Sequence, residues 1–387
     1  MRILHVVPTY LPATRYGGPI YAVHGLCRAL AARGHDVHVY TTNVDGAGVS
    51  PVALGATVDV EGVKVRYFPT ALGRRLYRSP PMGAALADAM ASFDVLHLHS
   101  VFLWPTSAAA RLARAQGVPY FLAPRGMLVA DLIRRRSRLP KSAWIELFER
   151  RNIAGAAALH FTSDRERRDM EALGLAAQAA IVVPNGVDMP PQSAPTAGAG
   201  RPFVLALGRI NWKKGLDRLI AALAHAPGVD LVVAGDDEGD TTAQLRGVAR
   251  AHGVAERVTF AGPAHGAGKW ALMRACAALA LPSYSENFGN VVLEAMACAR
   301  PTIVTPEVGL ADVVAQSGAG LVVAGDPQPL GEAIATLMAD AALRARMGEA
   351  GRKVARERFS WAAVAADMEG HYARARAPRR METSPVV

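Results

Sequence analysis

Residues 279–297 read LALPSYSENFGNVVLEAMA, which joins an apolar strand signal, a polar loop and a helix signal in that order. The apolar run ends at Pro282, and apolar residues at helical spacing resume after Gly289. Gly289 lets the backbone approach a ligand closely, and the free N–H groups at the start of the next helix favour a phosphate. Glu286 and Glu294 are acceptor-only carboxylates that suit the hydroxyls of a ribose and a sugar. Local composition alone leaves open that the first acid caps the helix and the second is simply exposed.

A second signal is LGRINWKKGLD at residues 207–217, directly after another apolar run. Gly208 permits a tight turn at the end of that strand. Arg209 and Lys214 then project from one loop, where a guanidinium and an ammonium suit a diphosphate. The alternative is that both are solvated loop charges. A Gly-Asp pair at residues 235–236 follows the next strand and is a weaker signal of the same kind.

The first half of the chain contains Gly17 and Gly18 after its first strand. Without side chains, these residues would let the backbone approach a phosphate or an acceptor sugar. The pattern is not Gly-x-Gly-x-x-Gly, and residues 40–43 (YTTN) offer no acid at the end of the second strand. A nicotinamide enzyme is therefore disfavoured.

Two histidines and an arginine stand near strand ends of the first half. His97 and His99 flank a leucine, so by alternation they share one face of a strand. His99, at the end of the strand, is the better candidate for a ligand site, although a hydrogen-bonded core histidine is the alternative for each. Arg125 lies in PRGM (residues 124–127) at the end of the next strand.

Outside these motifs, short apolar runs alternate with helical patterns, which indicates parallel βαβ units. Strands are expected at residues 2–7, 36–40, 63–67, 94–98 and 118–122, and again at 203–207, 231–234, 258–260, 277–281, 302–304 and 320–323. A stretch rich in Pro, Ala, Gly and Ser follows PNGVD (residues 184–188) and interrupts the alternation. We therefore expect an α/β protein of two doubly wound halves, residues 1–185 and 186–360, with a ligand cleft. Residues 376–387 are expected to form a frayed tail.

The composition excludes several classes of protein. The 387 residues include only three cysteines, an odd and widely spaced set that argues against a disulfide framework and for buried free thiols. The N-terminal apolar run is too short for a signal peptide, and none of the apolar runs reaches the length of a membrane span. We expect a soluble, cytoplasmic protein.

The formal net charge is +10, from 43 Lys and Arg against 33 Asp and Glu. Arg134, Arg135, Arg136, Arg138 and Lys141 form a basic cluster before apolar residues at helical spacing (144–148). Such a segment suits peripheral contact with an anionic membrane, and a solvated helix end is the alternative. Aromatic residues do not interleave the basic ones, so nucleic acid is not an expected partner.

Together these residues resemble the retaining glycosyltransferases of family 4, which have the GT-B fold of two Rossmann-like domains facing a cleft. The resemblance covers nearly the whole chain. It is carried by four elements in order: Gly17-Gly18, the segment 184–188, Gly208-Arg209 with Lys214-Gly215, and Glu286 with Glu294 as Glu-x7-Glu. The segment 124–127 with the basic stretch after it looks like members that build bacterial surface polysaccharides.

The resemblance implies a role for each candidate residue. The second half would bind the nucleotide-sugar donor, with Glu294 on the ribose and Glu286 on the hexose. Arg209 and Lys214 would neutralise the diphosphate in place of a metal. The expected donor contacts also include Gly17, Gly18, Gly208, Phe288, Gly289 and Asn290. His99 would line the acceptor side and take part in catalysis, with Arg125 and Tyr16 beside it. The helix at 361–375 would pack back on the first domain.

The resemblance also implies the reaction: metal-independent hexosyl transfer with retention, from a UDP- or GDP-sugar to a free glycan or a polyprenyl-diphosphate-linked acceptor. No further cofactor is expected, and surface-glycan synthesis near the inner face of the cell membrane is the expected setting. Two other functions stay open. One is a nucleotide-sugar 2-epimerase of the same fold, which the Glu-x7-Glu spacing disfavours, and the other is a non-catalytic basic protein of the membrane surface.

Overall fold

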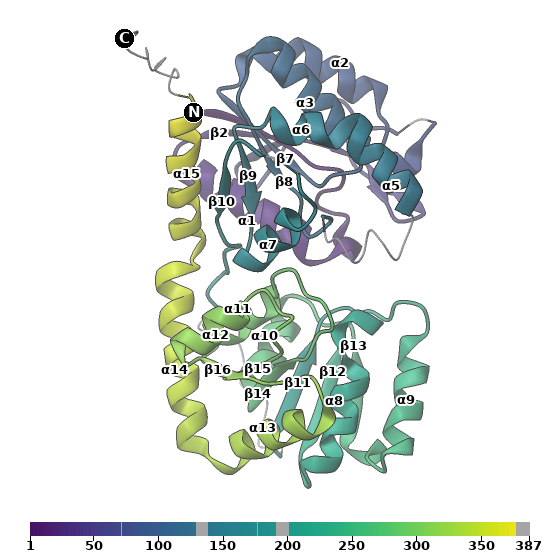
Figure 1. Ribbon diagram of the computed structural model, residues 1–387, viewed down its shortest axis with the longest axis vertical. Helices are drawn as coiled ribbons and strands as arrows, with labels where there is room; N and C mark the ends of the chain where they lie inside the picture. Colours follow the sequence, from purple (N-terminus) through teal and green to yellow (C-terminus); the bar gives the residue numbers. More distant parts are fainter. Residues whose placement is uncertain (71, 129–137, 176, 191–200, 377–387) are drawn as a thin grey trace. The chain divides into compact units, whose positions relative to one another are not determined.

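The computed structural model describes residues 1–70, 72–128, 138–175, 177–190 and 201–376. The chain divides into two compact units, each with strands and helices (Figure 1). Unit 1 comprises Met1–Pro184 with the segment from Val364 onward, and unit 2 comprises Asn185–Ala363. Each unit is built on its own mainly parallel sheet with helices in the crossovers. The predicted fold class of two parallel-sheet α/β domains is confirmed.

Unit 1 contains an eight-stranded sheet in the order β10-β9-β8-β7-β1-β2-β6-β5. Its strands are β1 (Arg2–Val6), β2 (Asp36–Thr42), β5 (Thr57–Val60), β6 (Val63–Phe68), β7 (Val95–His99), β8 (Tyr120–Ala123), β9 (Ala158–Phe161) and β10 (Ala180–Val182). The edge strand β5 pairs antiparallel with β6, and the other neighbours pair in parallel. A short hairpin, β3 (Val44–Asp45) with β4 (Gly48–Val49), follows β2.

The helices of unit 1 lie in the crossovers between these strands. They are α1 (Gly18–Ala32), α2 (Pro80–Ala89), α3 (Trp104–Gln116), α5 (Arg138–Trp144), α6 (Arg150–Ala154) and α7 (Asp164–Glu171), with a π-helical turn at Ile145–Glu149. The chain returns to unit 1 through α15 (Trp361–Arg376), whose Tyr372 is fully buried. Its ring packs edge-on against Phe121 of β8, so this helix covers one face of the unit 1 sheet.

The two faces of the unit 1 sheet differ in chemistry. One face holds a continuous apolar cluster that includes Leu4, Leu96 and Leu98. Because side chains alternate along a strand, the intervening positions point to the opposite face. Those positions hold buried histidines, with His5 of β1 paired in register with His97 of β7.

Unit 2 contains a six-stranded parallel sheet in the order β13-β12-β11-β14-β15-β16. The strands are β11 (Phe203–Leu207), β12 (Asp230–Ala234), β13 (Val258–Gly262), β14 (Ala278–Leu281), β15 (Thr302–Val304) and β16 (Gly320–Val322). The helices are α8 (Leu216–Ala222), α9 (Thr241–Ala251), α10 (Gly266–Ala275), α11 (Asn290–Ala297), α12 (Ala311–Ser317), α13 (Pro327–Ala339) and α14 (Ala341–Arg358). Apolar clusters cover both faces, with Leu205 in one and its neighbour Val204 in the other.

Most expected strands are present within a residue or two of the predicted bounds. Three strands of the unit 1 sheet, β5, β9 and β10, were missed, as was the β3–β4 hairpin. β9 and β10 contain four and three residues, the same lengths as the predicted β14 and β15, so shortness alone does not explain why they were missed. The three cysteines are buried and free, as predicted. Among the described residues, none of the helices is both long and apolar enough to cross a membrane.

Candidate active site

The loop between β14 and α11 carries Glu286, and α11 itself carries Glu294, the second acid of Glu-x7-Glu. Gly289 is the N-cap of α11 with φ 96°, in the left-handed region, and a Cβ there would lie 3.1 Å from Val308 Cγ1. The positive φ therefore favours glycine, and a Cβ would also be packed tightly against Val308. The loop is held by the segment after β15, because Gly309 N donates to the Glu286 carbonyl at 3.0 Å and Leu310 N donates to the Phe288 carbonyl at 3.1 Å. Val292 N donates to the Gly289 carbonyl at 2.9 Å. The helix N-terminus carries positive potential that favours an anion.

The loop after β11 lies directly against this loop. Gly215 has φ 63°, and a Cβ at this position would overlap the carbonyl oxygen of Pro282. The close approach brings the Lys214 ammonium onto the Glu286 carboxylate, where the two form an ion pair. Both side chains are about four-fifths buried, with 19% and 21% exposed. Two residues that are 72 apart in the sequence thus form one charged unit.

A second charged unit joins the loops after β11 and β12. Arg209 donates to Glu238 at 2.6 Å, and the Asn211 amide donates to the other oxygen of that carboxylate at 2.9 Å. Backbone hydrogen bonds join the two loops, since Ile210 N donates to the Asp236 carbonyl at 2.7 Å and Glu238 N donates to the Ile210 carbonyl at 3.0 Å. The backbones approach so closely that a Cβ at Gly235 would overlap the carbonyl oxygen of Gly208. The sequence signal for Glu238 was absent, since an acid two residues after the weak Gly-Asp pair has no distinctive pattern.

A third charged unit contains Glu294 of α11. Its Oε1 accepts from the ammonium of Lys269, which belongs to α10, at 2.9 Å. Lys269 was not singled out from the sequence, because a lone lysine on a helix is usually a solvated charge. At the start of α11, Asn290 Oδ1 accepts from the Asn185 amide at 2.9 Å.

Unit 2 therefore gathers its predicted residues at the carboxyl ends of the central strands. Cations and carboxylates alternate there beside a helix N-terminus, at the edge where open parallel sheets bind ligands. The ammonium, the guanidinium and the helix N-terminus attract phosphate oxygens, while the carboxylates accept hydroxyl groups. This arrangement fits a molecule that combines a diphosphate with polyhydroxylated rings.

In unit 1, the glycine pair forms the start of α1. Gly17 is the N-cap of α1 with φ 71° and follows a 3-10 turn at Thr14–Tyr16, to which its N–H donates at 2.9 Å. Gly18 is the first residue of the helix. Tyr16 lies in the turn, and its side chain is outside the described part of the structure.

The four histidines on the sheet face of unit 1 form two hydrogen-bonded chains. His160 Nε2 lies 2.8 Å from the Val183 carbonyl, and its Nδ1 lies 3.1 Å from His97 Nε2. His97 Nδ1 lies 2.6 Å from the Tyr372 hydroxyl. The carbonyl can only accept, so in neutral rings the direction is fixed: His160 donates to the carbonyl, His97 donates to His160, and the tyrosine donates to His97.

The second chain begins at a cation. Arg125 Nε and an Nη lie 3.3 Å and 3.2 Å from His99 Nδ1 and can only donate to it. His99 Nε2 therefore carries the proton and donates to His5 Nδ1 at 3.0 Å. The remaining nitrogen, His5 Nε2, is buried without a hydrogen-bond partner among the described residues.

Burial keeps these imidazoles neutral. It lowers the pKa of His5 and of His160 to about 3, and the Arg125 guanidinium contributes in the same direction. Burial also places the pKa values of His97 and His99 well below their usual range. His99 is 2% exposed, so the structure places it within the sheet face and against Arg125 rather than at an open surface.

The backbone next to Arg125 is held by a buried acid. Arg125 has φ 56°, and Glu166 of α7 accepts from the next N–H, that of Gly126, at 2.6 Å. The same carboxylate accepts from the Thr162 N–H and hydroxyl, each at 2.8 Å. The structure thus brings together the predicted pair His99 and Arg125, and it adds Glu166 and His5, which the sequence analysis missed.

The histidine cluster does not have the chemistry of a metal centre. One nitrogen from each of His5, His97 and His99 lies within 4.8 Å of the others. Both ring nitrogens of His97 and of His99 already take part in hydrogen bonds, and a guanidinium contacts His99. A bound cation would break these bonds and lie next to a fixed positive charge.

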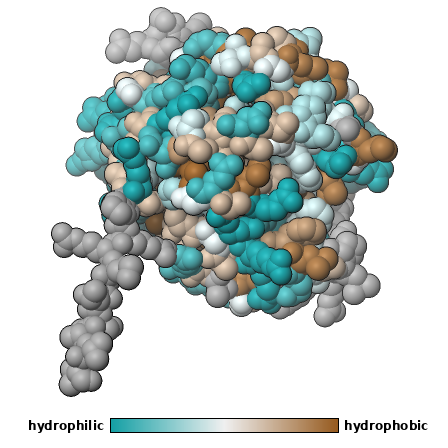
Figure 2. Space-filling view, turned by 90° about the horizontal axis from the view of Figure 1, so that it is seen from above, coloured by the Kyte–Doolittle hydropathy of each residue, from teal (hydrophilic) through white to brown (hydrophobic). Residues whose placement is uncertain are grey.

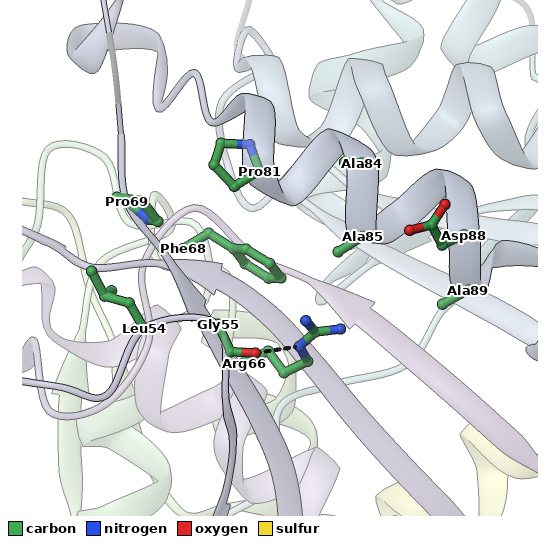
Figure 3. A pocket seen from close by; sticks show the side chains of 10 residues that line it. All are labelled: Leu54, Gly55, Arg66, Phe68, Pro69, Pro81, Ala84, Ala85, Asp88 and Ala89. Carbon is green, nitrogen blue, oxygen red and sulfur yellow. Dashed lines mark hydrogen bonds between the residues drawn. The ribbon is translucent and has the colours of Figure 1, made fainter.

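A surface pocket of about 580 Å³ lies between β6, α2 and the loop at Leu54 and Gly55 (Figure 3). Its lining is mostly apolar, and Arg66 crosses it to donate to the Gly55 carbonyl at 3.1 Å. The pocket contains none of the predicted residues.

The basic cluster is only partly described. Arg134, Arg135 and Arg136 lie outside the described residues, and the side chain of Arg138 is likewise outside them. Lys141 lies over the Phe102 ring, 5.5 Å from its centroid.

Comparison with known proteins identifies the family. The family model "Glycosyl transferase 4-like domain" matches residues 17–186, and "Glycosyl transferases group 1" matches residues 192–354. D-inositol 3-phosphate glycosyltransferase of Xylanimonas cellulosilytica is 32% identical over 97% of this chain and 96% of its own length. The protein of the same name from Stackebrandtia nassauensis is 31% identical over 98% and 93%.

Solved structures agree on the fold. Sucrose-phosphate synthase from Thermosynechococcus elongatus superposes with a TM-score of 0.76 at 22% identity, covering 97% of this chain and 99% of that one. Anabaena HepE, in complex with UDP and glucose, superposes with a TM-score of 0.75 at 20% identity over 97% and 100%. With the family models, the relatives and the fold in agreement, this chain belongs to the group 1 glycosyltransferases of family 4 and has the GT-B fold.

Proposed function

We propose that this glycosyltransferase moves a hexose from a nucleotide diphosphate sugar to an acceptor hydroxyl with retention of anomeric configuration and without a metal ion. The observation that carries the proposal is the charged unit of Lys214 and Glu286 beside the N-terminus of α11, with Arg209 on the same loop. It combines groups for a diphosphate and groups for a sugar within one unit of the fold.

The diphosphate is the first requirement of such a donor. Lys214 and Arg209 each contact a carboxylate. Phosphate oxygens would replace those carboxylates as partners. Lys214 is only 19% exposed, so much of its desolvation has taken place before the donor binds. Negative charge grows on the diphosphate as the glycosidic bond breaks, and these cations would stabilise it. They would do so where other enzymes use a divalent ion.

The carboxylates then serve the sugars. When Lys214 turns to phosphate, Glu286 becomes free to accept hydroxyls of the donor hexose. Glu294, deeper in α11, would accept the ribose hydroxyls, and the backbone at Phe288, Gly289 and Asn290 would face the hexose and phosphate. These carboxylates would hold ligands and would not act as the acid and nucleophile of a glycoside hydrolase.

In the proposed reaction, the bond between the anomeric carbon and the diphosphate oxygen breaks while the acceptor oxygen forms a bond on the same face. The acceptor proton passes to an oxygen of the leaving diphosphate. Unit 1 would supply the acceptor side. His99 would act there as a neutral hydrogen-bond group, because burial keeps its pKa well below the usual range.

The acceptor class is open to a direct test. We propose a sugar or lipid-linked oligosaccharide in surface-glycan synthesis, and the names of the relatives make D-inositol 3-phosphate the competing acceptor. Purified enzyme is incubated with UDP-, GDP- and ADP-sugars and each acceptor, and the product anomer is read by NMR. Transfer with inversion, or only in the presence of added Mg²⁺ or Mn²⁺ and not in EDTA, would contradict the mechanism. Conversion of the nucleotide-sugar without acceptor would favour the epimerase.

We also propose that the protein is cytoplasmic and touches the inner face of the membrane through the segment around α5. Leu147 and Phe148 follow α5 and are 64% and 43% exposed, beside the basic stretch of the sequence. Figure 2 draws another view of the molecule, in which hydrophilic residues separate small hydrophobic patches. Co-sedimentation with anionic vesicles should fall in a Leu147→Ser, Phe148→Ser variant, and unchanged binding would refute this contact.

A further inference from the structure

We propose that Lys269 is a positioning residue for the ribose subsite, and that the preference of this enzyme for a ribonucleotide over a 2′-deoxyribonucleotide depends on it. The inference rests on the proposed function, in which Glu294 accepts the ribose hydroxyls. It extends that function to a residue outside the Glu-x7-Glu and Gly-Arg…Lys-Gly elements.

The contact that carries the inference joins two helices. Lys269 belongs to α10 and Glu294 to α11, and the ammonium lies 2.9 Å from Glu294 Oε1. The two side chains are 25% and 22% exposed, so the pair is mostly shielded from water. The ammonium also lies 4.6 Å from the centroid of the Trp270 ring, which gives it a second favourable contact.

The geometry leaves the carboxylate free for a ligand. An ionised carboxylate offers about four lone-pair sites on two oxygens. The ammonium occupies one site on Oε1, so Oε2 and the rest of Oε1 remain for two vicinal hydroxyls. A glutamate on a helix surface otherwise samples several rotamers, and fixing it before the nucleotide binds lowers the entropic cost of the contact.

The position of this pair separates it from the two diphosphate cations. Lys214 and Arg209 both lie on the loop after β11. Lys214 pairs with Glu286, which lies in the loop before α11, and Arg209 pairs with Glu238. Lys269 instead contacts an acid one turn inside α11, and it comes from the neighbouring helix. Its ammonium would therefore remain on Glu294 when the donor is bound.

The experiment measures nucleotide dissociation constants by calorimetry on the full chain. UDP, GDP and ADP are each compared with their 2′-deoxy forms, for the wild type and for Lys269→Met, Lys269→Arg and Glu294→Gln. Lys353→Met serves as the matched control, because this lysine is exposed on α14 in the same unit. The wild type should prefer the ribo form of its nucleotide about tenfold, the value of a hydrogen bond to a charged group.

The inference expects Lys269→Met to reduce that preference to about twofold or less, from the same hydrogen-bond estimate. Lys269→Arg and Lys353→Met should keep it. Equal loss of affinity for the ribo and deoxy forms in Lys269→Met would indicate that Lys269 contacts the nucleotide directly or only stabilises the fold, and it would overturn the inference. A preference for the ribo form that survives in Lys269→Met would also overturn it. If Glu294→Gln keeps the preference, or the wild type shows none, the ribose assignment of the proposed function fails together with the inference. Loss in Glu294→Gln but not in Lys269→Met refutes the role of Lys269 alone.

Discussion

Acidification should destabilise unit 1 well before it affects unit 2. Four buried histidines share one face of the unit 1 sheet, whereas the histidines of unit 2 are all exposed. Burial lowers the pKa of His5 and His160 from 6.5 to about 3, so each is neutral when folded and protonates readily when unfolded. Below about pH 6.5 the unfolded chain therefore binds more protons, and stability is lost as the pH falls.

The size of the effect follows from linkage. Between pH 7 and pH 5, a histidine whose pKa drops from 6.5 to about 3 on folding loses about 2 kcal/mol of stabilisation, and His5 and His160 together lose about 4 kcal/mol. His97 and His99 add to the loss, since their pKa values are also lowered by burial. Most carboxylates protonate below this window. Burial raises the pKa of Glu149 in unit 1, and this acid acts against the loss because protonation favours its folded state.

The assay is urea unfolding at pH 7, 6 and 5, followed by hydrogen exchange of peptides from β1 and β7. Peptides from β11 and β14 of unit 2 serve as the internal control. The unfolding midpoint of the β1 and β7 peptides should move to lower urea as the pH falls, while the control peptides change little. A midpoint for β1 and β7 that stays constant or rises toward pH 5 would refute the reasoning that burial holds these rings neutral.

The remaining predictions concern single contacts. Arg209→Ala or Lys214→Ala should lower turnover by about 10²–10³-fold through loss of one charge-stabilising group, and full turnover in either variant removes the diphosphate assignment. Gly235→Ala should destabilise unit 2 by about 1–3 kcal/mol, because its Cβ overlaps a backbone carbonyl; an unchanged urea midpoint speaks against that close approach. Tyr372→Phe should destabilise unit 1 by about 1–3 kcal/mol by leaving a buried imidazole nitrogen without its donor, and equal stability of the two proteins contradicts the proposed direction of the hydrogen bonds.

Most of the fold was readable from local pattern. The apolar runs before Gly208 and Pro282, and the helical spacing after each loop, predict βα units with good bounds. The short strands β9 and β10 and the antiparallel edge strand β5 were missed. Their formation depends on the neighbouring strand that supplies hydrogen bonds, and a single segment carries no record of its neighbour.

The candidate site was predicted only in part, because local sequence pattern marks some of its residues and not their partners. Arg209, Lys214, Glu286 and Glu294 stand next to glycines at strand ends, where the local pattern is distinctive. Their partners Glu238 and Lys269 lie in ordinary loop and helix sequence. Nothing in the residues around a partner shows which charge it will meet across the sheet edge.

By itself, the sequence determined that the chain forms two βα-repeating halves and which loops carry anion- and hydroxyl-binding groups. Periodicity and glycine placement are local properties, so they survive without a fold. Only the tertiary structure decided that Lys214 meets Glu286 and that Lys269 meets Glu294. It also decided that histidines from three strands form two neutral, buried hydrogen-bonded chains, one of which ends at Tyr372 of α15. Such pairings depend on strand order and on how closely backbones approach, and these are set by the packing of segments far apart in the chain.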